Sequence, residues 1–155
     1  MNCLDIKSIA DLSSALLTPV IGVVTTIILI NQFRLEKRKW RLDLFEKRYA
    51  VYRATLEFLH SMMRKGKCTP DSQGAFLEGT RDRALFFESE VNEILDEVWS
   101  AGIDLEMHQD IFKDLPVGEE RTKHVRAAAE IKKSLPGLGK KVQDSFAKYI
   151  QLKEK

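Results

Sequence analysis

Histidine and glutamate side chains are the first candidates for chemistry in this chain, whose three histidines are His60, His108 and His124. His60 and His108 border the apolar faces of two different predicted helices, with Glu106 close to His108. If those helices are neighbours, the three side chains could bind a metal ion or act in acid–base catalysis. The alternative, which we favour, is that His108 packs at a bundle edge while the other histidines are solvated. We therefore predict no metal, no cofactor and no catalytic site.

Acidic residues recur at helical spacing in the second half of the chain. They are Glu88, Glu90, Glu93, Asp96 and Glu97. Helices that carry carboxylates do build di-metal centres, but such centres need a Glu-x-x-His motif on each of two paired helices. The sequence has no such pair of motifs. We therefore predict that the acidic residues form a solvated helix face.

Other signatures of enzymes are missing from the sequence. It has none of the motifs of phosphate-binding loops, dinucleotide-binding turns, zinc proteases or α/β-hydrolases. With 25 basic and 23 acidic residues, its net charge of +2 argues against an obligate nucleic-acid binder. Two cysteines are too few for a disulfide-rich secreted scaffold. These features predict a protein that is not an enzyme and that binds no nucleic acid.

An uncharged segment of 22 residues, 12–33, precedes all the candidate residues above. About 20 apolar residues suffice for a helix to cross a bilayer, and Pro19 and Gly22 are tolerated in such helices. One alternative is a buried helix of a soluble protein. The other is a cleaved signal peptide, whose early region should be positive, whereas this one contains Asp5 and Asp11. We predict a transmembrane helix over 12–33.

Basic residues are distributed unequally about this segment. Only Lys7 precedes it, whereas Lys47, Arg48 and a basic cluster follow it, and this cluster comprises Arg34, Lys37, Arg38, Lys39 and Arg41. The asymmetry predicts a short external N-terminus, 1–11, and a cytoplasmic domain, 34–155. The basic cluster serves as a topology determinant, or alternatively makes a weak contact with anionic lipids.

Small residues recur every four positions within the predicted membrane helix. They are Ser14, Thr18, Gly22 and Thr26. A stripe of small residues lets two membrane helices approach closely. We interpret it as a helix-packing face that would bring copies of the chain together.

The cytoplasmic part begins with two apolar rows at heptad spacing. The first, which we call the seam, comprises Leu42, Phe45, Tyr49, Tyr52, Leu56 and Leu59 and continues to Met63. The second row is Leu44, Val51 and Phe58. Steps of three and four are typical of coiled coils, and two rows indicate a helix covered on more than one side. We expect the membrane helix to continue into this one, with the seam as the keystone of the bundle.

Further helices are predicted down the chain. The turn-rich segment 66–74 should precede a short helix through Phe86. A long helix should start near Ser89, and its apolar pattern covers 87–112. A third should span 119–135 and stop at Leu135-Pro136-Gly137, before a last helix over 138–150. The predicted fold is all-α: a transmembrane helix continuing into an antiparallel cytoplasmic bundle of three or four helices.

Three segments carry a resemblance to a known group of proteins. Segment 41–52, RLDLFEKRYAVY, resembles a sequence motif of small uncharacterised bacterial inner-membrane proteins that have one N-terminal span. Segments 84–98 and 146–150 are similar to that group's second and closing helices. The resemblance implies a bacterial inner (plasma) membrane location and this helical architecture. It implies no activity.

These features lead to two hypotheses for function. The first is a non-enzymatic module for protein interaction or self-assembly, anchored at the inner membrane, whose partner is another protein or a second copy. The alternative is a membrane-associated effector or sensor, such as an accessory protein in phage defence or stress.

Overall fold

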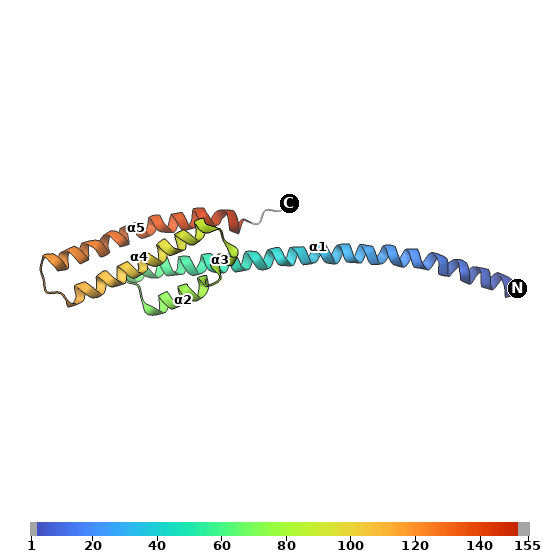
Figure 1. Ribbon diagram of the computed structural model, residues 1–155, viewed down its shortest axis with the longest axis horizontal. Coiled ribbons are helices and arrows are strands. Elements are labelled where there is room, and N and C mark those ends of the chain that lie inside the picture. Colours follow the sequence, from blue (N-terminus) through green and yellow to red (C-terminus); the bar gives the residue numbers. More distant parts are fainter. Residues whose placement is uncertain (1–2, 152–155) are drawn as a thin grey trace. The chain divides into compact units, whose positions relative to one another are not determined.

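Helices joined by short connections, with no strand, make up the residues that the structure, a computed structural model, describes (Figure 1). The backbone is described for residues 3–151, and the side chains for residue 19 and residues 21–151. The helices are α1 (Cys3–Lys65), α2 (Pro70–Thr80), the single turn α3 (Arg83–Phe86), α4 (Ser89–Asp114) and α5 (Glu119–Ile150). The all-α prediction is confirmed.

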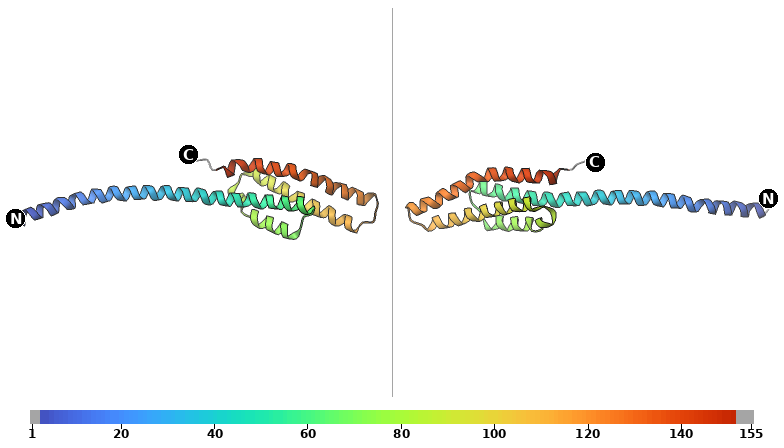
Figure 2. Two further views of the ribbon diagram at one scale, coloured as in Figure 1. Left: turned by 180° about the vertical axis from the view of Figure 1, so that it is seen from behind. Right: turned by 45° about the horizontal axis from the view of Figure 1, so that its top comes forward.

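The chain divides into two compact units, Met1–Asp43 and Leu44–Lys155. The first consists of the earlier part of α1. The second is a helical bundle made by the later part of α1 together with α2–α5. Within the bundle, α4 and α5 lie side by side in every view (Figures 1 and 2).

Contacts between named residues give the directions of the bundle helices. Ion pairs join Glu90 to Lys148 and Glu97 to Lys141, so α4 and α5 are antiparallel. Residues later in α1 contact residues later in α4. Phe58 lies against Gly102, and Gly66, just after α1, accepts a hydrogen bond through its carbonyl from Gln109 at 2.6 Å. Helices α1 and α4 therefore run in the same direction, and the predicted antiparallel arrangement holds for α4 with α5.

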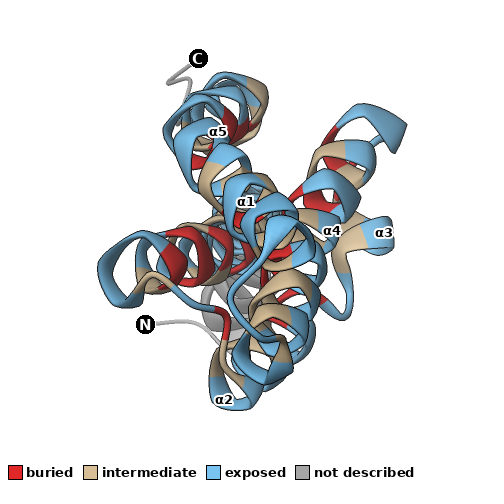
Figure 3. Ribbon diagram, turned by 90° about the vertical axis from the view of Figure 1, so that its left-hand side faces the viewer, coloured by how far each residue is buried: buried red, intermediate tan, exposed pale blue. Residues whose placement is uncertain are grey.

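The core of the bundle is apolar and rich in aromatic rings. One cluster joins α1, α2 and α4, with ring centres 4.7 Å apart for Phe58 and Phe76 and 5.9 Å apart for Phe76 and Trp99. A second joins α1 to α5, where the rings of Tyr52 and Phe146 are 5.3 Å apart. Figure 3 shows the buried residues on the sides of the bundle helices that face one another. The two clusters bind α1 to every long helix of the bundle.

Helix α2 begins earlier than the sequence predicted. The turn ends at Thr69, which caps the helix: its Oγ1 accepts from the backbone N–H of Ser72 at 3.4 Å, and the Ser72 Oγ lies 3.1 Å from the Thr69 nitrogen. Pro70 follows at the first helical position, where its missing N–H costs nothing. The predicted turn over 66–74 was therefore too long.

Helix α5 contradicts the prediction of a stop at Leu135-Pro136-Gly137, because it continues through Pro136 to Ile150. An internal proline costs roughly 3 kcal/mol. Fully burying a large apolar side chain returns about 1.5–3 kcal/mol. Buried side chains lie on one face of α5 on both sides of the proline: Ala128, Leu135, Leu138, Val142 and Phe146. Their combined burial outweighs the proline.

Candidate functional site

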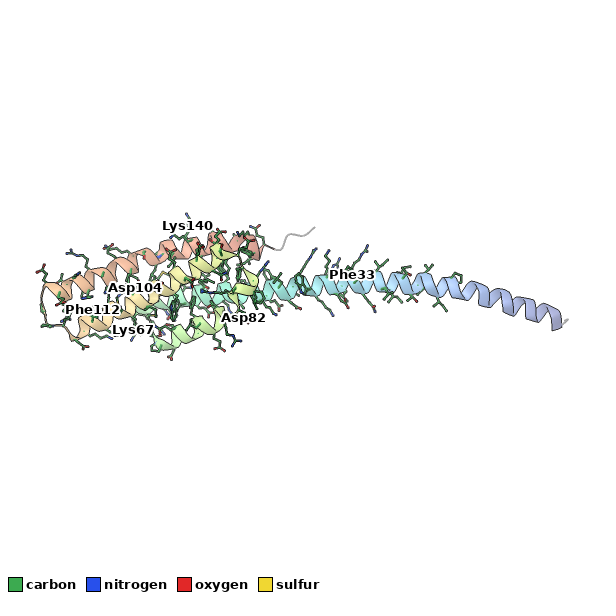
Figure 4. The ribbon with its side chains drawn as sticks, in the orientation of Figure 1. Phe33, Lys67, Asp82, Asp104, Phe112 and Lys140 are labelled. Atoms are coloured by element: carbon green, nitrogen blue, oxygen red, sulfur yellow. The ribbon has the colours of Figure 1, made fainter. Side chains whose placement is uncertain are left out.

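The part of α1 between Ile21 and Phe33 displays large apolar side chains on its surface. Their exposed fractions run from 48% at Ile30 to 69% at Phe33, and Figure 4 shows Phe33 projecting from the helix. The others are Ile21, Val23, Val24, Ile27, Ile28 and Leu29. At 3.6 residues per turn these positions point in every direction around the helix axis. We call residues 21–33 the apolar segment.

A hydroxyl within this segment is satisfied by the helix itself. Thr26 Oγ1 donates to the carbonyl of Gly22, four residues earlier, at 2.8 Å. An unpaired hydroxyl is costly in an apolar medium, and this bond removes that cost. Of the predicted packing face, Gly22 and Thr26 are described, and a Cβ on Gly22 would meet no atom within 4 Å. The side chains of Ser14 and Thr18 lie outside the described residues.

The predicted transmembrane helix is not supported by the structure. Among the residues that the structure describes, no helix is long and apolar enough to cross a membrane. The side chains of residues 12–18 and of residue 20, all within the predicted span 12–33, lie outside that description, as do the side chains of the predicted external N-terminus, 1–11. The span stays a prediction.

The basic cluster directly follows the apolar segment on α1. All its members, Arg34, Lys37, Arg38, Lys39 and Arg41, are exposed, as are Leu35 at 53% and Trp40 at 67%. One acidic residue, Glu36, lies among them. Cations and exposed aromatic rings therefore share one short stretch of helix.

The predicted seam is mostly at the margin of the core. Leu59 is fully buried, but Tyr49 is 44% exposed and Leu42, in the first unit, is 50% exposed. Phe45, Tyr52 and Leu56 are partly buried. The face of α1 that is buried comprises Val51, Thr55, Phe58, Leu59 and Met62, which includes two members of the second row. The side chains of α1 that fill the core thus come mainly from outside the seam.

The histidine pairing differs from the one that the sequence suggested. His108 Nδ1 lies 3.0 Å from His124 Nδ1, so one ring donates a hydrogen bond and the other accepts it. His60 is exposed, and Glu106 accepts a hydrogen bond from Gln73 of α2. In the part of the chain that the structure describes, no cluster of three or more His, Cys, Asp or Glu has metal-binding geometry.

Cys68 lies buried beside the close contact of α1 and α4. Its pKa is raised above the usual value, chiefly because burial disfavours the thiolate, while hydrogen bonds from Gln73 and Ser72 act in the opposite direction. The nucleophilic form of a cysteine is the thiolate, so this thiol is poorly suited to covalent chemistry.

The acidic face of α4 is exposed and largely paired with cations. Lys148 lies 2.7 Å from Glu90 and 3.5 Å from Glu88, Lys141 lies 2.8 Å from Glu97, and Arg83 pairs with Asp96. Exposed pairs of this kind each contribute about 0–1 kcal/mol. These pairs join α4 to α3 and α5 and add little to the stability of the bundle.

Comparisons with protein-family models, with curated proteins and with solved structures find no match to this chain.

Proposed function

We propose that this chain is a single-pass membrane protein whose N-terminal helix anchors a non-enzymatic helical bundle at the cytoplasmic face of a bacterial inner membrane. The observation that carries the proposal is the apolar segment, whose large side chains point all around α1 and keep about half of their surface exposed. Exposed apolar surface costs roughly 25 cal/mol per Å² in water. A hydrocarbon surrounding removes this cost on every side of the helix at once.

The residues on either side of the segment support the same placement. Towards the C-terminus the apolar segment gives way to the basic cluster, with Phe33 and Trp40 exposed beside it. Aromatic rings and long cationic side chains are stable at the boundary between hydrocarbon and headgroups. Cytoplasmic loops are enriched in Lys and Arg, and the basic cluster therefore supports a cytoplasmic location for the bundle.

Membrane fractionation with reporter fusions tests this anchor. The full chain should remain in the membrane pellet after an alkaline wash. A reporter active only in the cytoplasm should be active when fused after Lys155, and one active only in the periplasm should be inactive. A chain released by the wash refutes the anchor, and the opposite reporter pattern refutes the orientation.

The role of the bundle in this proposal is interaction with a protein partner or with a second copy. An exposed apolar stripe on α4 supports it: Ile103, Met107 and Ile111 are four residues apart and are 37%, 46% and 37% exposed. Side chains four apart share one helix face, and apolar residues on such a face are typical of contact surfaces.

Cysteine crosslinking in native membranes tests this role. The background should lack reactive thiols through Cys3→Ser and Cys68→Ser. Met107→Cys should then form a discrete adduct, whose mass distinguishes a second copy from another protein. Lys123→Cys, an exposed position on α5, is the matched control. Equal, diffuse adducts from both positions would refute a specific surface on α4.

A further inference from the structure

The basic residues that follow the apolar segment fall into two groups with different surroundings. Lys47 and Arg48 belong to the bundle: Lys47 Nζ lies 5.6 Å from the centre of the Phe86 ring, and the Arg48 guanidinium lies 5.0 Å from that of Tyr149. Arg48 also donates to the Phe86 carbonyl at 3.2 Å. The basic cluster, by contrast, has no ion-pair partner among the residues that the structure describes. Its side chains are available to a ligand.

Four of the five cations in the cluster share one face of α1. From Arg34, the steps to Lys37, Arg38 and Arg41 are three, four and seven residues. On a helix of 3.6 residues per turn, these positions lie within about a third of the circumference. We call them the basic stripe; Lys39 and Glu36 point elsewhere.

Two exposed aromatic residues adjoin the basic stripe. Phe33 and Trp40 are seven residues apart, so they share a face of α1 next to the stripe, and they are 69% and 67% exposed. Aromatic rings in this position settle at the depth of lipid headgroups, where phosphates lie. The stripe and the aromatic face therefore occupy the same narrow band along the helix axis.

We propose that the basic stripe binds the headgroups of anionic phospholipids, an inference that rests on the proposed membrane anchor. Three of its four members are arginines, whose planar guanidinium groups bind phosphate through two parallel hydrogen bonds. Each Lys or Arg close to an anionic leaflet strengthens association by about fivefold. Setting topology requires positive charge near the span but no particular helix face. The gathering of four cations on one face is what favours recognition of a lipid.

Fluorescence quenching of Trp40 tests this inference in the full-length chain. The chain is reconstituted into phosphatidylcholine vesicles that contain a fixed minority of phosphatidylglycerol. In one set the phosphatidylglycerol is brominated, and in the other an equal amount of phosphatidylcholine is. Bromine quenches tryptophan on contact, and a Trp40→Phe variant measures the contribution of the second tryptophan, Trp99. Brominated phosphatidylglycerol should quench Trp40 about twofold more strongly, and added salt should weaken this preference.

Two matched variants connect the preference to the stripe. Replacing all four stripe residues, Arg34, Lys37, Arg38 and Arg41, by Gln should make the two brominated lipids equally effective. The control replaces four exposed cations of the bundle by Gln, Lys67, Lys123, Arg126 and Lys140, and should keep the preference with the same change in net charge.

Equal quenching in the unaltered chain, or a preference that persists in the stripe variant, overturns the inference but leaves the membrane anchor standing. Absence of quenching by either lipid overturns both.

Discussion

Apolar side chains are arranged in opposite ways in the two units. In the apolar segment they surround the helix and are about half exposed, as at Ile21 with 56% and Ile30 with 48%. In α5 they form one buried stripe, from Ala128 to Phe146, and the remaining surface is mostly exposed. Burial against other helices requires helical periodicity, whereas burial in lipid requires only length and the absence of charge. Like residues from the two units should therefore respond differently to substitution.

The phenylalanine pair should show the largest difference. Phe58 is 2% exposed and its ring centre lies 4.7 Å from that of Phe76. Phe58→Ala should cost about 3–5 kcal/mol in the free energy of unfolding, measured by urea denaturation of the chain in mild detergent. Phe33→Ala, in the apolar segment, should leave this free energy unchanged. Equal losses from both would mean that Phe33 belongs to a folded core.

For the isoleucine pair, the larger effect is expected in the apolar segment and not in the bundle. Ile27→Lys places a charge within the apolar segment, where insertion into a bilayer should become less favourable by about 3–4 kcal/mol. The retained fraction after an alkaline wash of membranes should fall sharply. Ile103→Lys, at a position 37% exposed on α4, should leave retention unchanged. If Ile27→Lys were retained as fully as the unaltered chain, lipid would not surround this segment.

The glycine pair concerns space around the helix. A Cβ on Gly102 would lie 2.6 Å from Phe58 Cζ and 3.4 Å from Cys68 Sγ. Gly102→Ala should therefore cost about 1–3 kcal/mol, despite the higher helix propensity of alanine. Gly22→Ala should not reduce stability, because a Cβ there meets no atom within 4 Å. Thermal denaturation of both variants measures the difference, and a Gly102→Ala variant of unchanged stability would show that Phe58 can move aside.

The smallest effect is expected at Phe45, which the sequence suggested as a keystone. Its ring stacks on Tyr49, with centres 5.9 Å apart, but the side chain is only partly buried. Phe45→Ala should cost about 1–2 kcal/mol, less than Phe58→Ala in the same urea measurement. Exposed Glu46 is the control, and Glu46→Ala should stay within about 0.5 kcal/mol. A loss at Phe45 as large as that at Phe58 would restore the seam as the centre of the bundle.

The sequence was most informative where one helix determines its own structure. Periodicity predicted helical structure along the chain, and the lack of charge over 12–33 was visible directly. It was less informative where the outcome depends on a partner. Both apolar rows of α1 had heptad spacing, and the choice between them depends on where Phe76 and Trp99 lie.

Two further errors have the same origin. Pro136 would end an isolated helix, but burial of Leu135 and Leu138 carries α5 past it. The contact of His108 with His124 depends on how α4 and α5 are aligned, which the connection between them determines and periodicity does not reveal. Local patterns thus predicted elements, while their alignment required the packed structure.

The order in which core residues occur along the chain bears on how the protein is made. The buried face of α1, from Val51 to Met62, is synthesised early, whereas Val142 and Phe146, which complete the core, come much later. Because domains fold as units during synthesis, the bundle cannot close until the ribosome has passed Phe146. The apolar segment leaves the ribosome well before that moment. Under the proposed membrane anchor, delivery to the membrane would precede folding, and the nascent chain would be tethered while its own core is still incomplete.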